Sequence, residues 1–181
     1  MTQIPEDNFA QPWGVGHRPE VPRTGTEREQ LATMLDWHRA TFELKCADVP
    51  VARLSERVIQ RSALTLHGLL RHLAAVERWW FRQQFAGEDV PSLYYSDDDP
   101  DQDFDALGGD VDEVFAVWHD ECERSRQVVA AAASLDDLGV AVARGGPISL
   151  RWVMLQMVAE YARHNGHADL LREQIDGATG Y

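Results

Sequence analysis

Apolar residues recur every three or four positions in four separate stretches of the chain, which is the spacing of one buried helix face. The stripe of the first stretch consists of Leu31, Met34, Leu35 and Phe42. Thr26 and Glu29 precede it with the S/T-x-x-E spacing of a capping box, so we expect a helix to start after Thr26. This helix should end near Asp48, because Pro50 interrupts helical hydrogen bonding.

The second stretch is expected to begin after Ser62 or Thr65 and to end near Gly87. Its apolar stripe consists of Leu66, Leu69, Leu70, Leu73, Val76 and Trp80. A long connection without helical periodicity follows, up to about Asp110. A connection of this length is unusual between helices that pack as simple neighbours, and it favours a crossover along a helical bundle.

The third stretch begins at Val111 and fades after the alanine run at 130–133. The fourth follows Ser149, a good helix cap, and should stop at Gly177. Four long amphipathic helices without convincing strand alternation predict an all-α four-helix bundle over residues 26–177. Residues 1–25 are rich in Pro and Gly and predict an extended N-terminal arm.

Composition narrows the range of partners. The 181-residue chain carries a formal net charge of −13, and such an acidic surface repels phosphate backbones and anionic lipids, so neither nucleic acid nor membrane is expected as a partner. No apolar run approaches the roughly 20 residues that span a bilayer, and the N-terminus lacks the features of a secretory signal. We therefore expect a cytoplasmic protein. Cys46 and Cys122 fall within helical patterns and are interpreted as buried small side chains, not nucleophiles.

Three polar side chains share one face of the fourth helix. Glu160, His164 and His167 are spaced i, i+4 and i+7, and the first two lie close enough to bind one metal ion together. His72, on the flank of the second stripe, offers a third ligand and leaves one coordination position open, as catalytic sites require. From spacing alone, a lone His such as His72 is more often a hydrogen-bonded core residue, and Glu160 and His164 could form an ordinary contact between side chains four apart.

The segments LTLHGLLRHLAAVERWWFR (64–82) and EYARHNGHADLLREQIDG (160–177), with LDWHRATFELKCADVP in the first helix, resemble the DinB/YfiT-like superfamily of metal-dependent four-helix bundles. The likeness is greatest to an actinobacterial branch of mini-circle type. It implies an up-down-down-up bundle in which His72, Glu160 and His164 bind a divalent metal, zinc or nickel in most members.

The chain departs from the commonest pattern of this superfamily, in which both ligands of the fourth helix are His. Glu160 in the first position is similar to the mycothiol-dependent maleylpyruvate isomerase branch, and a harder carboxylate ligand leaves the identity of the metal open. His167 is expected beside the ligands or in contact with substrate, with a role as a substitute ligand as a further alternative.

The resemblance implies a metal-dependent S-transferase or isomerase that uses a low-molecular-weight thiol of the mycothiol type. The metal would activate the thiol cosubstrate, and the partners would be that thiol and a small electrophile. Two other functions stay open: a hydrolase in which the metal activates water, and a non-catalytic, stress-linked binding module.

Other polar and aromatic patterns are interpreted as structural. The acidic run at 97–103 is similar to a calcium loop, but Gln102 and Gly108 stand where Gly and Glu are required, so we interpret it as a solvated loop. The aromatic run 79–81 cannot face the core with all three side chains, so at least one is expected under the long connection, in a substrate wall or in a homodimer contact. Arg78 and Arg82 are interpreted either as contacts for an anionic cosubstrate or as solvated side chains.

Overall fold

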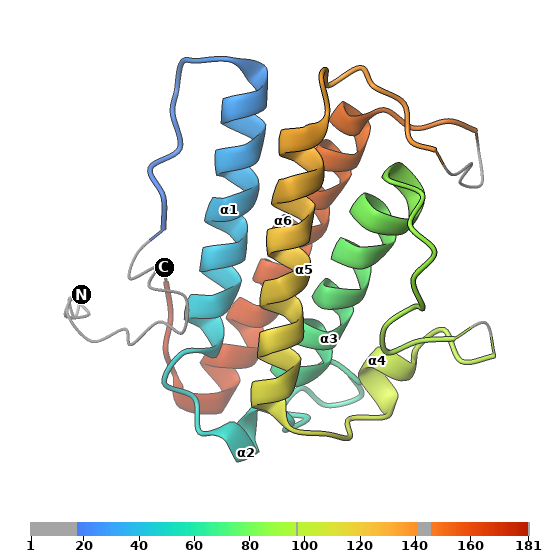
Figure 1. Ribbon diagram of the computed structural model, residues 1–181. Coiled ribbons are helices and arrows are strands. Elements are labelled where there is room, and N and C mark those ends of the chain that lie inside the picture. Colours follow the sequence, from blue (N-terminus) through green and yellow to red (C-terminus); the bar gives the residue numbers. More distant parts are fainter. Residues whose placement is uncertain (1–17, 97, 141–145, 181) are drawn as a thin grey trace.

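Four long helices run side by side in the computed structural model, which describes residues 18–96, 98–140 and 146–180 (Figure 1). These helices are α1 (Glu27–Cys46), α3 (Leu66–Glu77) with its continuation η1 (Arg78–Phe85), α5 (Val111–Ala131) and α6 (Leu150–Asp176). Helices α1 and α6 run in one direction, and α3 and α5 run in the other. The up-down-down-up order of an all-α four-helix bundle is thereby confirmed.

Helix ends lie where the capping residues predict them. Thr26 and Glu29 form the capping box of α1, and Ser149 accepts a hydrogen bond from the Trp152 amide at the start of α6. Thr65, not Ser62, caps α3 through a 2.9 Å hydrogen bond from the Gly68 amide to its hydroxyl. At the other end of α6, Gly177 has φ of +77°, a left-handed conformation that glycine adopts without steric cost.

Two four-residue helices lie in the connections and were not predicted. Helix α2 (Val51–Leu54) follows α1, and α4 (Gln102–Asp105) lies within the long crossover between η1 and α5. Segments this short have no hydrophobic periodicity to read. Among the described residues there is no strand, only an isolated bridge between Leu138 and Ser149. Of the predicted arm, residues 1–17 lie outside the described residues, and residues 18–25 form no helix.

Helix α3 continues as an eight-residue π-helix, η1. The Ala86 amide donates to the Phe81 carbonyl, five residues back, at 2.9 Å. Such wide turns are rare. Within η1, Phe81 is fully buried, whereas the Trp80 ring packs edge-on against Trp152 of α6 with centroids 5.0 Å apart.

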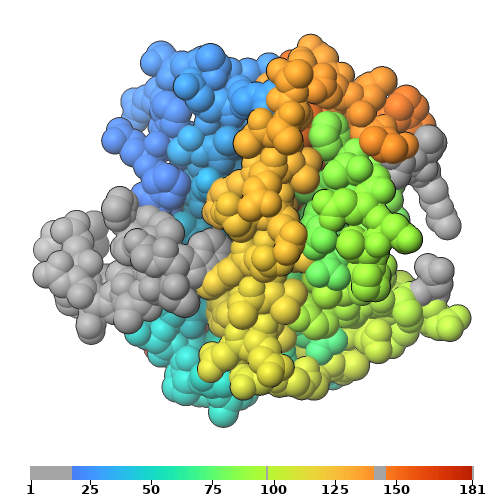
Figure 2. All heavy atoms as spheres, viewed as in Figure 1, coloured from blue at the N-terminus to red at the C-terminus, as the bar shows by residue number. Residues whose placement is uncertain are grey.

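The bundle core consists of large apolar side chains from all four long helices. Helix α1 packs mainly against α6 and α3 mainly against α5, and Figure 2 shows α5 lying between α1 and the connection that follows η1 on one face of the molecule. The largest fully buried side chains include Trp118, Tyr161, Phe42, Phe81, Leu69, Leu73 and Met157. No helix among the described residues is long and apolar enough to cross a membrane.

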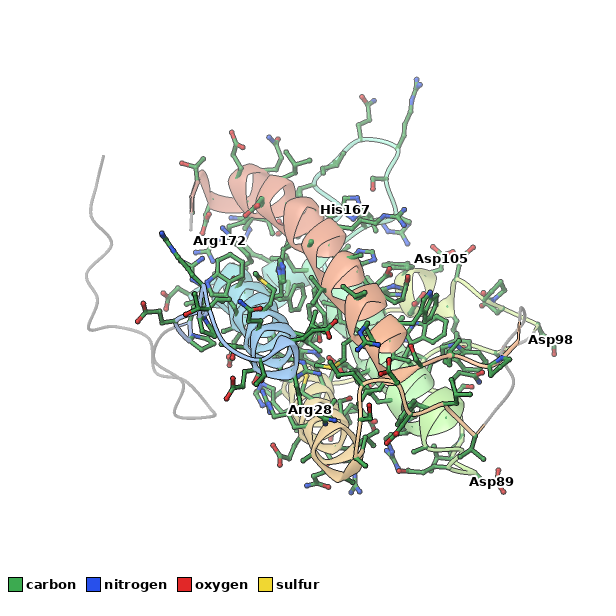
Figure 3. The ribbon with its side chains drawn as sticks, turned by 90° about the horizontal axis from the view of Figure 1, so that it is seen from above. Arg28, Asp89, Asp98, Asp105, His167 and Arg172 are labelled. Atoms are coloured by element: carbon green, nitrogen blue, oxygen red, sulfur yellow. The ribbon has the colours of Figure 1, made fainter. Side chains whose placement is uncertain are left out.

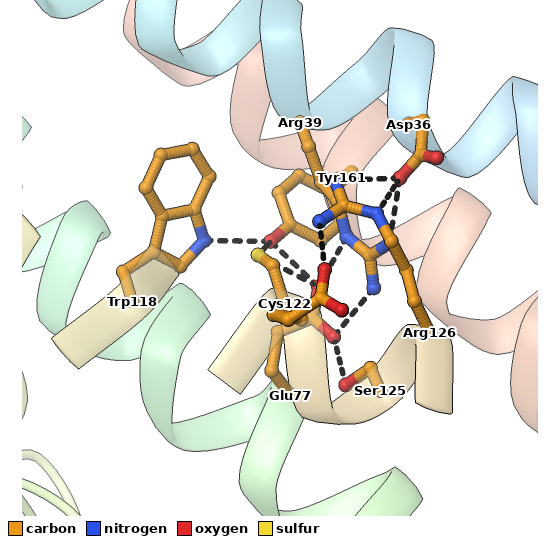
Figure 4. A network of polar contacts seen from close by, with 9 residues as sticks. Asp36, Arg39, Glu77, Trp118, Cys122, Ser125, Arg126 and Tyr161 are labelled. Carbon is orange, nitrogen blue, oxygen red and sulfur yellow. Dashed lines mark hydrogen bonds and ion pairs between the residues drawn. The ribbon is translucent and has the colours of Figure 1, made fainter. Parts of the chain in front are cut away.

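A polar network is enclosed within this core (Figure 4). Glu77, at the end of α3, is fully buried and receives two hydrogen bonds from the Arg39 guanidinium of α1, at 2.8 and 2.7 Å. Ser125 of α5 and Tyr161 of α6 also donate to its carboxylate, at 2.6 and 2.8 Å. Trp118 donates in turn to the Tyr161 hydroxyl at 2.8 Å. One carboxylate thus contacts side chains of the other three long helices.

Candidate metal centre

Helices α3 and α6 bring His72, Glu160 and His164 together. The Nε2 atoms of His72 and His164 lie 3.1 and 3.0 Å from the same carboxylate oxygen, Oε1 of Glu160. All three ligand atoms lie within 4.8 Å of one another. Since Glu160 and His164 are one turn apart on α6, the helix itself pairs them, and the packing of α3 on α6 adds His72.

The electrostatics of this cluster favour a positive charge at its centre. Burial alone would lower the pKa of His72, but the hydrogen bonds and charges of Asp103 and Glu160 outweigh it and raise that pKa to about 9. Hydrogen bonds from His164 and then His72 hold the pKa of Glu160 well below its usual range. The metal-free site is therefore an anionic carboxylate beside a protonated imidazole.

The donor set fits a divalent transition metal. Two imidazole nitrogens and one carboxylate oxygen are common zinc ligands, and donor atoms around one tetrahedral ion, at bonds of about 2.0 Å, lie about 3.3 Å apart. Two of the three separations, 3.0 and 3.1 Å, are close to this value, and the third, between the two imidazole nitrogens, is at most 4.8 Å. Three protein ligands leave one position of a tetrahedron for a further group.

Asp103 contacts the cluster from α4, and it was not among the predicted site residues. Its Oδ2 atom accepts a 2.7 Å hydrogen bond from Nδ1 of His72, on the side of the ring away from Glu160. The interpretation of the 97–103 run as a solvated loop is wrong for this residue, because Asp103 is only 3% exposed. The one hint in the sequence is Phe104, an apolar residue inside an acidic segment, whose ring lies 5.1 Å from that of His72.

His167 lies next to His164 and does not contact Glu160 by any hydrogen bond. The Nδ1 atoms of the two imidazoles are 3.2 Å apart, which requires one ring to donate and the other to accept. Burial, followed by the charges of His164 and Arg163, lowers the pKa of His167. Seen from above in Figure 3, His167 lies on the same side of α6 as α4, whereas Arg172 points toward α1. A supporting position beside His164 agrees with this geometry.

The two cysteines are buried side chains, as the sequence predicts. For both Cys46 and Cys122, burial raises the pKa of the thiol, so neither is a reactive nucleophile at neutral pH.

Arg78 and Arg82 both bind the buried carboxylate of Glu121. The interpretation of these arginines as solvated side chains is therefore wrong, because both pair with a buried carboxylate. Their contact with an anionic cosubstrate stays a prediction.

An all-α bundle of this topology is consistent with the DinB-like class of proteins. The chain belongs to the mycothiol-S-transferase family, whose sequence model matches residues 30–177. No curated protein is similar enough in sequence to match.

A solved structure supports the fold. The conserved protein of a locus from Enterococcus faecalis superposes with a TM-score of 0.63 over 86% of this chain and 100% of its own. Because only 13% of the aligned residues are identical, this likeness shows the fold alone.

Proposed function

We propose that the protein is a metal-dependent S-transferase that joins a thiol of the mycothiol type to a small electrophile. His72, Glu160 and His164 would hold the metal, zinc or nickel, between α3 and α6. The observation that carries the proposal is the convergence of two imidazole nitrogens on one carboxylate oxygen, within a chain of the mycothiol-S-transferase family.

In this proposal the protein's side chains bind the metal and balance its charge, and the reacting sulfur belongs to the cosubstrate. A divalent cation held by His72, Glu160 and His164 would lower the pKa of a bound thiol and so raise the fraction of reactive thiolate at neutral pH. Glu160 remains ionised over the physiological range, because its pKa is held well below its usual range, and it balances part of the cation's charge. Since both cysteines are buried and protonated, the nucleophile must arrive with the cosubstrate.

Conjugation of mycothiol to monochlorobimane tests the proposal. In this reaction a carbon–sulfur bond forms, the carbon–chlorine bond breaks, and chloride and the thiol proton are released. We expect fluorescent product to form faster with zinc- or nickel-loaded protein than without protein, and the gain to disappear after chelation. Metal-loaded protein that shows no gain over the uncatalysed reaction would contradict the transferase, and ester or amide hydrolysis without added thiol would favour the metal-activated water alternative.

Metal affinity should rise with pH. In the metal-free protein Asp103 and Glu160 raise the pKa of His72 to about 9, so at pH 7 the ring carries a proton on Nε2 that a metal must displace. Release of one proton raises the apparent affinity about tenfold for each pH unit below that pKa, or about 100-fold between pH 6.5 and 8.5. Competition titrations against a chelator of known pH dependence measure this slope. Equal affinity at both pH values would show that the metal does not replace this proton.

A further inference from the structure

The carboxylates of the crossover differ sharply in exposure. Asp98, Asp99, Asp101 and Asp105 are exposed, as expected for an acidic loop, whereas Asp103 is buried. Burying a carboxylate is costly unless it is paired. Asp103 pairs through Oδ2 with His72, and its buried Oδ1 has no hydrogen-bond partner among the described residues.

The contact with Asp103 determines which nitrogen of His72 is free. An acceptor 2.7 Å from Nδ1 keeps the proton on that nitrogen. When a metal displaces the proton on Nε2, the atom that faces Glu160, the lone pair is exposed on that nitrogen and not on Nδ1. A carboxylate on the outer nitrogen of a metal-binding imidazole also fixes the plane of the ring and increases its basicity.

Helix α3 holds α4 in the position that this contact requires. Arg71, the neighbour of His72, donates to the main-chain carbonyls of Gln102 and Ala106 at 3.2 and 2.6 Å, on either side of Asp103. One turn earlier, Gly68 leaves room for the ring of Phe104, since a Cβ there would lie only 3.2 Å from it. Gly68, Arg71 and His72 of α3 thus contact the four-residue helix α4 and hold it in place.

We propose that Asp103 is a positioning residue of the metal centre, and that α4 is a docked segment through which the crossover sets metal affinity. This inference rests on the proposed metal site and adds a residue outside the three ligands. Because coupling between two equilibria is reciprocal, the factor by which the docked Asp103 strengthens metal binding is also the factor by which metal stabilises the docked state of α4.

Zinc and cobalt affinities of the wild type and three variants test the positioning role of Asp103. Asp103→Asn keeps an oxygen that can accept from Nδ1 but loses the charge, and Asp103→Ala loses both. We expect the affinity for both metals to fall about 10–100-fold, and to fall further in the alanine variant. Loss of a carboxylate that hydrogen-bonds to a metal-binding histidine has an effect of this size in other metal sites. Asp105→Asn is the matched control, because Asp105 lies on the same short helix but forms only an exposed pair with Arg57. The cobalt absorption bands should change in both Asp103 variants and stay unchanged in the control.

Amide hydrogen exchange, measured on the full-length wild type and on the Asp103→Asn and Asp105→Asn variants, tests the coupling between metal binding and the docking of α4. The amides of Phe104, Asp105 and Ala106 donate within α4, so their exchange reports whether it is docked and folded. We expect zinc to slow their exchange in the wild type and in Asp105→Asn, and to have much less effect in Asp103→Asn. A purely structural Asp103 would leave the response to zinc intact.

The two proposals fail in distinguishable ways. If the wild type binds no metal, the proposed metal centre is wrong. If the wild type binds zinc, but Asp103→Asn binds it equally well and α4 exchanges at the same rate with and without zinc, the metal centre survives and the role of Asp103 is overturned.

Discussion

His164→Ala is expected to lose stoichiometric metal binding and thiol transfer together. His164 is buried and supplies one of two imidazole nitrogens that converge on Oε1 of Glu160. Loss even of an outer partner of a metal ligand costs about 10–100-fold in affinity, so loss of a ligand should cost more than about 100-fold. Metal analysis after gel filtration, combined with the monochlorobimane assay, measures both effects.

Two further variants serve as controls for His164→Ala. Arg163→Ala, an exposed neighbour on the same turn, should bind metal as the wild type does. If His164→Ala retains part of its metal, the double variant with His167→Ala decides whether His167 replaces the missing ligand, since it lies 3.2 Å from His164. Full metal content in the single and the double variant would remove His164 from the site.

Glu77→Gln is expected to lower the free energy of unfolding by about 3–5 kcal/mol. The substitution removes the fully buried carboxylate that pairs with the Arg39 guanidinium, which is itself 3% exposed, and leaves Arg39 paired with the partly exposed carboxylate of Asp36 at 2.9 Å. It also weakens the hydrogen bonds from Ser125 and Tyr161. Urea denaturation followed by circular dichroism gives the change, and a loss below about 1 kcal/mol would contradict the account of this network.

The Glu77 prediction has its own control on the surface. Glu123 pairs with Arg126 at 3.3 Å in an exposed contact, so Glu123→Gln should change stability by less than about 1 kcal/mol. Replacing both partners, as Arg39→Met with Glu77→Leu, should restore part of the loss, because no buried charge is then left unpaired. The network matters for the metal centre since Tyr161 follows Glu160 on α6 and ties that helix to the end of α3.

Local signals account for most of the fold that could be predicted. Thr26, Ser149 and Gly177 act on backbone groups a few residues away, so their sequence context alone places the helix ends. The pairing of Glu160 with His164 is equally local, because side chains four apart share a helix face. The position of His72 beside its apolar stripe made it a candidate, and the family resemblance strengthened that choice, but its approach to α6 depends on how two helices pack.

Buried charges were the part that sequence patterns could not reveal. Glu77, Asp103 and Arg82 look like solvated residues in their own segments, and each is buried only because a partner arrives from a distant one. Asp103 is the most consequential case, as 31 residues separate it from His72 and α4 is too short to show a periodic pattern. The π-helical continuation of α3 also has no signal of this kind.

Anomalous diffraction from crystals of the metal-loaded protein, collected at the absorption edge of the bound metal, tests the central claim most directly. The account predicts one strong peak between α3 and α6, at about 2.0–2.2 Å from Nε2 of His72, Nε2 of His164 and a carboxylate oxygen of Glu160. A protein that is fully loaded and active but shows its peak away from these three side chains would contradict it.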